Sequence, residues 1–209
     1  MPNFMHPITK ESFAIIDREI GSHSFSPAEY AILRRTIHST ADFELANLIG
    51  FSPGAIEGAI AALRQRVPVV VDVTMVKQGV TGMLAKTFGN FLISAVERVA
   101  IAPEGKTRTE TGMLRCFEEF PEAIFAIGNS PTALKALCSE LKQQTAPSPA
   151  LIIGAPVGFV FVEESKAALA ELSVPQIRID GRKGGSPVAA AILNALIVLA
   201  WERETGEII

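Results

Sequence analysis

The sequence is poor in the residues on which several classes of protein depend. Only two of its 209 residues are cysteines, Cys116 and Cys138, and no CxxC pair is present. A disulfide framework is therefore not predicted, and a reducing cytoplasm fits the composition better than secretion. The three histidines have no HxxxH or HxH spacing, so we predict no zinc or similar metal site. The net charge of -3 gives no basic excess, which argues against nucleic acid as a partner.

Long apolar runs and the common motifs of nucleotide binding are also missing. The longest apolar run covers residues 188–201 and contains Asn194, whereas a membrane span needs about 20 residues. We expect this run to form a buried or dimer-forming helix, and we predict no membrane partner. Residues 1–12 lack a basic stretch followed by an apolar one, so no signal peptide is expected. The motifs GxxxxGK[ST], GxGxxG after the first strand and GxSxG are absent.

The residues that are present predict a single domain, 1–209, in two parts. With 48% hydrophobic residues, the chain can bury a substantial core. Residues 1–66 have the apolar spacing of helices, and Ser26 and Glu29 form the pattern of a capping box at the start of one of them. The expected helices cover about 9–22, 26–38, 42–49 and 52–66.

Residues 67–209 change to short β-branched and apolar runs separated by helical stretches. The runs cover 68–72, 91–96, 123–127, 150–153 and 176–179, and helices are expected at about 107–120, 131–144, 163–172 and 187–204. Alternating strands and helices with connections of this length imply right-handed crossovers. We therefore predict an α/β fold, a doubly wound five-stranded parallel sheet of flavodoxin-like type with an N-terminal helical extension. The run 91–96 is alternatively part of one helix over 83–99.

Polar side chains follow four of the predicted strands, and in a parallel sheet these positions lie at one edge. Two of these loops start a helix with Ser-Pro, which leaves free amides at the positive end of the helix dipole. Several cations lie nearby, so this edge should attract anions although the protein is acidic. Because the phosphate motifs are missing, a ligand with several separate carboxylates is favoured. The candidate ligand-binding residues are Asp72, Lys77, Arg108, Asn129, Thr132, Lys166, Lys183 and Ser186, with Arg182 adding positive charge.

His38 is the candidate for proton transfer. Residues 34–42 place it among arginines, hydroxyls and a carboxylate, and histidine is the side chain that ordinarily titrates near neutral pH. Thr40 and Asp42 are predicted to orient its ring. A lone histidine at a helix end is, however, more often a surface or capping residue. The other candidates have equally ordinary alternatives: Asp72 as a cap, Asn129 as a turn residue, Ser12 as an exposed helix serine, and Arg34, Arg35 and Arg108 as surface charges.

Six motifs in a fixed order resemble those of the precorrin-8X methylmutase family. This family works in the aerobic cobalamin pathway and has an anaerobic counterpart that acts on cobalt-precorrin-8. The resemblance extends over about residues 7–195, and Ser130 stands where the family commonly has alanine. The motifs are Ile37-His38-Ser39-Thr40-Ala41-Asp42, Asp72-Val-Thr-Met-Val-Lys-Gln-Gly79, Thr107-Arg108-Thr109, Gly128-Asn129-Ser130-Pro131-Thr132-Ala133-Leu134, Pro156-Val-Gly-Phe159 with Glu164-Ser-Lys166, and Gly181-Arg-Lys-Gly-Gly-Ser186.

The resemblance implies a flavodoxin-like fold, a homodimer with sites near the interface, and an isomerisation without a cofactor. A methyl group would migrate from C11 to C12 of the corrin precursor, giving hydrogenobyrinate or its cobalt analogue. The family's catalytic histidine falls on His38, its substrate-contacting serine on Ser12, and its arginine on Arg108.

The residues agree with the chemistry that the resemblance implies. A macrocycle with many carboxylate arms suits scattered cations better than a single phosphate loop does. A [1,5] shift requires no redox cofactor, metal or covalent nucleophile. We hypothesise that His38 protonates a ring nitrogen or stabilises that proton, which makes the conjugated system a better electron sink. The alternatives are a nucleotide- or phosphosugar-binding transferase and a non-catalytic corrinoid carrier.

Overall fold

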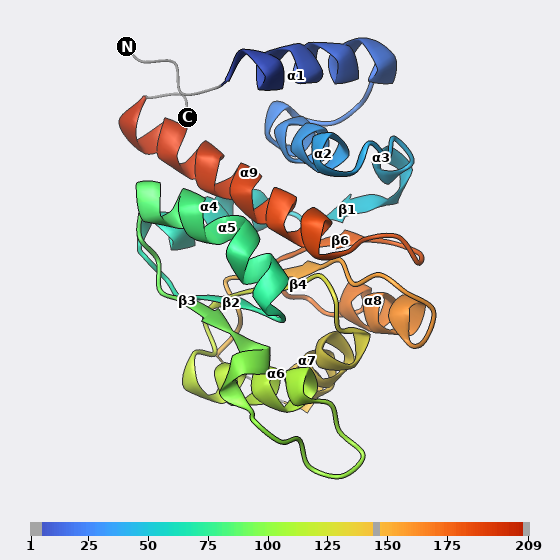
Figure 1. The fold of residues 1–209 in the computed structure, drawn as a ribbon, viewed down its shortest axis with the longest axis vertical. Helices are drawn as coiled ribbons and strands as arrows, with labels where there is room; N and C mark the ends of the chain where they lie inside the picture. Colours follow the sequence, from blue (N-terminus) through green and yellow to red (C-terminus); the bar gives the residue numbers. More distant parts are fainter. Residues whose placement is uncertain (1–5, 144–146, 207–209) are drawn as a thin grey trace.

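The computed structural model describes residues 6–143 and 147–206, and its helices lie on both sides of a central sheet (Figure 1). The predicted helix end at Gln144 lies outside the described residues. The strands are β1 (Ile49–Phe51), β2 (Val69–Val71), β3 (Leu92–Ser94), β4 (Ile124–Ile127), β5 (Leu151–Gly154) and β6 (Gln176–Ile179). The helices are α1 (Pro7–Ile20), α2 (Pro27–Thr40), α3 (Leu45–Leu48), α4 (Ala55–Arg64), α5 (Thr74–Lys86), α6 (Arg108–Glu119), α7 (Pro131–Gln143), α8 (Val162–Ala170) and α9 (Ser186–Thr205), with a 3-10 turn η1 (Ala95–Arg98).

The sheet is mixed and has six strands in the part of the chain that the structure describes, in the order β1-β6-β5-β4-β2-β3. Strands β2 to β6 are parallel to one another, and each overlaps one of the five predicted runs. The α/β prediction is therefore confirmed, but the prediction of a five-stranded, wholly parallel sheet is wrong. Strand β1 adds an antiparallel edge, in which Ile49 lies opposite Ile179.

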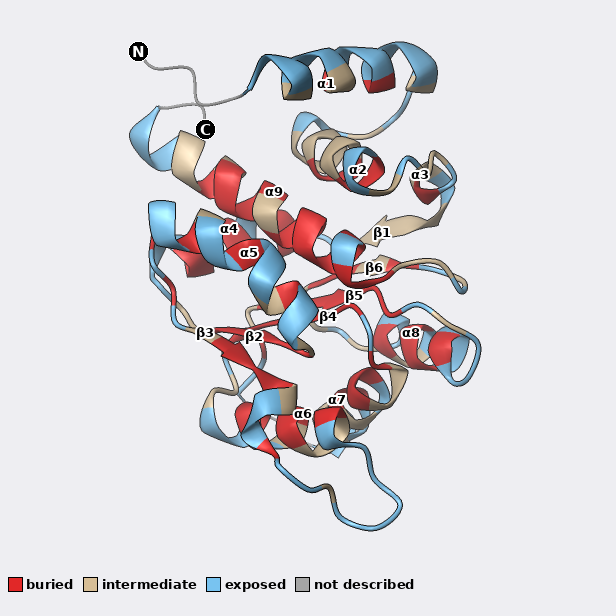
Figure 2. Cartoon of the chain, viewed as in Figure 1, coloured by how far each residue is buried: buried red, intermediate tan, exposed pale blue. Residues whose placement is uncertain are grey.

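The two faces of the sheet carry separate cores because successive residues of a strand point to opposite faces. Val69 and Val71 pack with α2, α4, α5 and α9, whereas Val70 packs with α6, α7 and α8. Helix α1 forms a further layer outside α2, against which it places Phe13 and Ile16. Figure 2 shows the consequence: most of the α1 surface is exposed, while β2, β4 and β5 are buried and the edge strand β1 is intermediate.

Helix α9 is the central helix of the first face. It packs against α2, α4 and α5, and its close approach to α5 requires Gly79, where an added Cβ would lie 2.9 Å from Ala190 Cβ. Asn194, which interrupts the apolar run, donates a hydrogen bond to Gly79 O. The helix is long and apolar enough for a membrane span, but 67% of its most apolar window is buried inside the protein. The prediction of a buried helix is confirmed (Figure 2).

Two predictions for the N-terminal part are wrong in detail. The helix expected at about 42–49 is only the single turn α3, and the chain then enters β1. The helix expected from Ser52 begins at Ala55, because Gly54 occupies the capping position. The Ser52 hydroxyl instead accepts a hydrogen bond from Gln176 N at 2.8 Å, which ties the end of β1 to the start of β6.

The region between β2 and β4 contains a helix that was not predicted. Helix α5 follows β2 directly, and its two glycines, Gly79 and Gly82, weaken the helical pattern of its sequence. The run 91–96 forms β3 and the start of η1, so a single helix over 83–99 is wrong. Thr87 ends α5, and Gly89 (φ 65°) then turns the chain into the strand.

Candidate functional site

His38 lies in the last turn of α2 and is exposed. Its Nδ1 is hydrogen bonded to Ser12 Oγ of α1 at 2.8 Å, and the Phe13 ring meets the imidazole edge-on with centroids 5.3 Å apart. The helix ends at Ala41, which adopts a left-handed conformation (φ 55°) and bonds back to Ile37 O. Ser12 of α1 and His38 of α2 are 26 residues apart in the sequence, and their hydrogen bond fixes one ring nitrogen of the histidine. The other nitrogen, Nε2, is left for another partner.

A second set of contacts holds α1 on α2. Asp17 of α1 accepts hydrogen bonds from Tyr30 Oη at 2.5 Å and from Arg34 Nη1 at 3.1 Å. The Arg34 guanidinium also lies 4.4 Å from the centroid of the Phe13 ring. Burial, together with the hydrogen bond to Asp17, raises the pKa of Tyr30 to about 12. These contacts fix α1, and therefore Ser12, relative to His38.

A mostly apolar cavity of about 320 Å³ lies between α1 and the end of α2, beside His38. Its volume is at the small end of the roughly 300–1,000 Å³ typical of small-molecule sites. Its polar lining includes the histidine and Ser12. The lining residues are Ile8, Glu11, Ser12, Ile15, Ile16, Glu19, Ile37, His38, Ala41 and Phe43.

Thr40 and Asp42, which were predicted to orient the ring, form their hydrogen bonds elsewhere. Thr40 Oγ1 donates to Thr36 O at 3.0 Å and accepts from the Asp42 amide. The Asp42 carboxylate accepts from Lys183 Nζ at 2.7 Å and from the Glu44 amide at 3.0 Å. The hydrogen bond to the imidazole comes from Ser12, so these contacts do not support the predicted orienting role.

Asp72 follows β2 and is fully buried. Its Oδ2 accepts from the amides of Asn129 and Ser130 at 2.6 and 2.8 Å, and its Oδ1 accepts from the Val73 amide at 2.9 Å. Burial raises the pKa of the Asp72 carboxyl, and the amide hydrogen bonds oppose that rise. The carboxylate joins the loops after β2 and β4. A direct contact with a ligand, as predicted, is incompatible with its burial.

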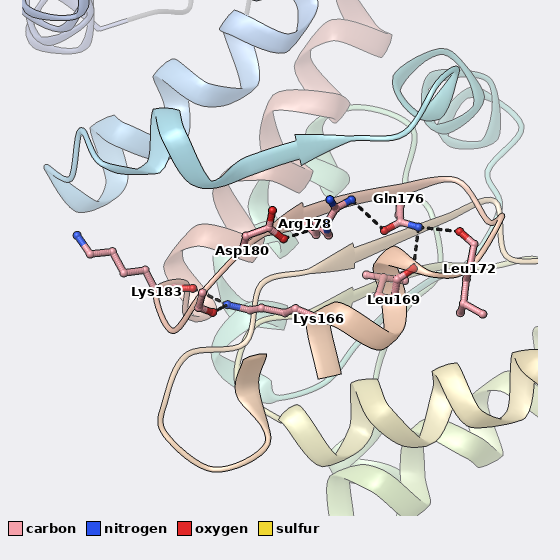
Figure 3. A network of polar contacts seen from close by, with 8 residues as sticks. Lys166, Leu169, Leu172, Gln176, Arg178, Asp180 and Lys183 are labelled. Atoms are coloured by element: carbon pink, nitrogen blue, oxygen red, sulfur yellow. Dashed lines mark hydrogen bonds and ion pairs between the residues drawn. The ribbon is translucent and has the colours of Figure 1, made fainter. Parts of the chain in front are cut away.

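Lys166 and Lys183 lie on opposite sides of the loop 181–186 (Figure 3). Lys166 is 1% exposed, and its Nζ donates to the carbonyls of Gly181 and Lys183, both at 2.7 Å. Burial lowers the pKa of Lys166 to about 8, although Asp180 and Glu163 act in the opposite direction. Lys166 is therefore a buried support of the loop, and its predicted contact with a ligand is not possible in this arrangement.

The side chain of Lys183 points away from Lys166, toward the end of α2 (Figure 3). Its Nζ lies 2.7 Å from Asp42 Oδ2 and 2.8 Å from Glu44 Oε2. Hydrogen bonding to these carboxylates raises the pKa of Lys183. The ion pair brings the carboxyl edge of the sheet next to the helix end that carries His38.

The remaining cations at the edge are also paired within the chain. Lys77 Nζ forms an ion pair with Glu97 at 2.6 Å, and Arg182 Nε forms one with Glu163 at 3.0 Å. Arg108 donates from Nε and Nη2 to the carbonyls of Val99 and Val96, at 2.7 and 3.0 Å. The edge is thus less electropositive than its count of cations predicts.

Three hydroxyls connect the starts of α6 and α7. Thr132 Oγ1 lies 3.0 Å from Thr107 Oγ1 and 3.1 Å from Ser130 Oγ, and the latter also accepts from the Ala133 amide. Thr132 lines a second cavity of about 420 Å³. The prediction that Ser-Pro caps both helices is confirmed for Ser130 and wrong for Ser186, because Gly185 occupies the capping position of α9.

The predicted residues therefore separate into two groups. Ser12 and His38 are in contact beside a cavity, and Asn129 and Thr132 lie near exposed surface at the edge. Asp72 and Lys166 are buried, and Ser186 is 6% exposed. Sequence reasoning missed Phe13 as a wall of the histidine site. The signal that could have found it is its helical spacing with Ile16, since both are buried residues of α1.

Comparison with known proteins shows a family likeness over most of the chain. The model of the family described as "Precorrin-8X methylmutase" matches residues 7–199. A protein of Synechocystis sp. named cobalt-precorrin-8 methylmutase is 53% identical, over 94% of this chain and 96% of its own. A protein of Sinorhizobium sp. named precorrin-8X methylmutase is 40% identical, over 90% of this chain and 92% of its own. The solved structure of the precorrin-8X methylmutase of Thermus thermophilus superimposes with a TM-score of 0.83 at 42% identity, covering 93% of this chain and 98% of that one.

Proposed function

Since this chain belongs to the precorrin-8X methylmutase family, we propose that it moves a methyl group from C11 to C12 of precorrin-8X or cobalt-precorrin-8, with His38 handling the proton. The observation that carries the proposal is the hydrogen bond between Ser12 Oγ and His38 Nδ1 beside an apolar cavity. The reaction is an isomerisation within one molecule, as in the family's methylmutases.

The arrangement suits a proton placed on a conjugated ring. With Nδ1 held by Ser12, Nε2 is the nitrogen that faces a bound ring, and the edge contact with Phe13 limits rotation of the imidazole. Protonation of a ring nitrogen draws electron density out of the π-system, which favours migration of the methyl group with its electron pair. Such a positioned proton donor typically contributes about 10²–10⁴-fold in rate.

The surface that one chain provides around the cavity is too small to enclose the proposed ligand. A cavity of about 320 Å³ does not enclose a macrocycle with several carboxylate arms, so the ligand extends beyond it. Exposed apolar side chains lie on α1 (Ile8, 69% exposed) and on the loop after β5 (Phe159, 86% exposed). We propose that a second copy of the chain covers part of this surface in a homodimer, for which sedimentation velocity is the direct test.

We also propose that the parallel part of the sheet is of the flavodoxin-like type. Numbered along the chain from β2, the five parallel strands have the order 2-1-3-4-5, which is the flavodoxin-like order, and β1 is an additional edge strand. Arg108, Asn129 and Thr132 are the edge residues proposed to meet carboxylate arms of the ligand. We propose a cytoplasmic location, because the cysteines Cys116 and Cys138 are free and buried.

Turnover by His38→Ala tests the proposal. Substrate in excess over enzyme should be converted by the wild type, followed by the product's visible spectrum, and the variant should be slower by about 10²–10⁴-fold. His23→Ala is the matched control, because His23 stacks on Tyr30, with centroids 4.1 Å apart, and does not line the cavity. Near-wild-type turnover by His38→Ala would exclude the proton role. Stoichiometric binding without turnover in the wild type would support a carrier instead.

A further inference from the structure

The loop 181–186 contacts parts of the protein that pack on opposite faces of the sheet. On one side, Lys166 comes from α8, which packs on the face of the sheet with α6 and α7. On the other side, Asp42 and Glu44 follow α2, which packs on the opposite face with α9. Lys183 belongs to both contacts, since its carbonyl accepts from Lys166 while its ammonium pairs with the two carboxylates.

We propose that Lys166 and Lys183, with Asp42 and Glu44, form a two-step clasp that positions the His38 end of α2 against the carboxyl edge of the sheet. In this lysine clasp Lys166 is a positioning residue that acts through the loop and never touches the ligand. The inference deepens the proposed function, because it explains how the edge residues and the histidine are held in one arrangement.

The first step is the buried one. Within the described chain, the Lys166 ammonium has no carboxylate within ion-pair distance. It donates hydrogen bonds to two backbone carbonyls, both at 2.7 Å. Hydrogen bonds from a charged donor are roughly twice as strong as neutral ones. The neighbouring acids are neutralised by other cations, since Asp180 pairs with Arg178 at 2.9 Å and Glu163 with Arg182 at 3.0 Å. Lys166 therefore fixes the position of the loop backbone.

The fixed loop is also tied to its neighbour. The Gly185 amide donates to Ala155 O at 2.8 Å, and an added Cβ at Gly184 (φ 149°) would lie 2.3 Å from the same carbonyl oxygen. The backbone of the loop therefore has little freedom to move. If the backbone of Lys183 is nevertheless displaced, its ammonium moves with it and the ion pair with Asp42 is disturbed.

The second step acts on a strained helix end. Ala41, between His38 and Asp42, has a left-handed conformation that is unfavourable for an L-residue other than glycine. Such a conformation persists only when its surroundings hold it. The ion pair from Lys183 to Asp42, directly after Ala41, supplies such a hold. Release of Asp42 is expected to let the last turn of α2 fray, and His38 lies in that turn.

Hydrogen exchange tests the clasp without any substrate. Lys166→Met should reduce the protection of two segments, residues 181–186 and residues 40–46. Lys183→Met should reduce it in 40–46 only, because the loop backbone is still held by Lys166. Lys142→Met is the matched control: Lys142 pairs with Glu171 at 2.8 Å between α7 and α8, so its loss should change neither segment. Should Lys166→Met fail to fold, Lys166→Gln replaces it in the same measurement.

Activity provides the second test. Misplacement of a catalytic group by about 1 Å is expected to cost up to about 100-fold, so Lys166→Met and Lys183→Met should each lower kcat/KM by about 10- to 100-fold. The double variant should be no slower than the slower single variant, because both substitutions break the same connection. Unchanged protection of 40–46 in Lys166→Met, or additive losses in the double variant, would overturn the clasp. A wild type without turnover would instead count against the proposed function, and the exchange result would stand.

Discussion

The two regions built from the predicted site residues differ in how they use their polar groups. At the carboxyl edge of the sheet, Asp72 and Lys166 are buried and bonded to the protein's own backbone. At the end of α2, His38 is exposed and has one side-chain hydrogen bond, to Ser12. A buried charge must be satisfied within the fold or it costs several kcal/mol, whereas an exposed imidazole retains a nitrogen for a ligand. Charge at a strand end is therefore poor evidence of a ligand contact, and a partly free side chain beside a cavity is better evidence.

Substitution at Asp72 should separate the two regions most strongly. Asp72→Ala leaves three backbone amides without their acceptor and should lower the free energy of unfolding by about 3–5 kcal/mol. Asp72→Asn keeps the shape of the side chain and one acceptor oxygen, but its NH2 group faces some of the backbone amides. The free energy of unfolding should therefore fall by less than in Asp72→Ala. His38→Ala should cost no more than about 0.5 kcal/mol, since the side chain is exposed. Urea unfolding of the three variants gives these values, and equal losses for Asp72→Ala and His38→Ala would contradict the comparison.

The pH dependence of stability should reveal the buried lysine. Burial lowers the pKa of Lys166 to about 8 in the folded protein, from the ordinary lysine value of 10.5. Below pH 8 both states hold the proton and the cost of burying the charge is fully present. Between pH 8 and 10.5 the unfolded chain holds the proton and the folded protein does not, so stability rises with pH, by about 3 kcal/mol in total.

Two buried thiols act in the opposite sense and require a control. Burial raises the pKa of Cys116 to about 11 and of Cys138 to about 12, from 9.0. Above pH 9 the unfolded chain loses these protons first, so the thiols lower stability as pH rises. Lys166→Met contains the same thiols, so the difference between the wild-type and Lys166→Met unfolding curves isolates the lysine. A difference that stays constant from pH 7 to pH 10 would show that Lys166 has an ordinary pKa.

The Ser12 hydroxyl should affect the reaction more than the fold. Ser12→Ala removes one hydrogen bond to Nδ1, which is worth about 1 kcal/mol, so kcat should fall about fivefold while the unfolding midpoint barely moves. Ser39→Ala is a matched control, since Ser39 Oγ donates to Thr36 O within α2. An unchanged kcat in Ser12→Ala would show that the bond does not serve the proton transfer.

The positions of strands β2 to β6 along the chain were predictable because they depend on local sequence, whereas the role of His38 stays a prediction. The runs that became β2 to β6 are buried on both faces and read as apolar without alternation, and His38 stood inside a motif that resembles a family. Strand β1 was not predictable, because three residues carry too little pattern and its pairing depends on β6, far along the chain. The burial of Lys166 was also hidden, since it depends on carbonyls 15 and 17 residues away that only the folded loop brings near.

The smallest effect is expected at the exposed ion pair of the edge. Lys77 and Glu97 are 36% and 48% exposed, so water screens their attraction, and Lys77→Met should change the free energy of unfolding by less than about 1 kcal/mol. Its effect on activity is the sharper question, because Lys77 was predicted to meet the ligand and its side chain is 36% exposed at this edge. Glu97→Gln is the matched partner: it frees Lys77 without removing it. A rise in KM for Lys77→Met with an unchanged KM for Glu97→Gln would show that Lys77 contacts the ligand. An unchanged KM in both variants would show that the ion pair is only a surface contact, unlike the histidine site.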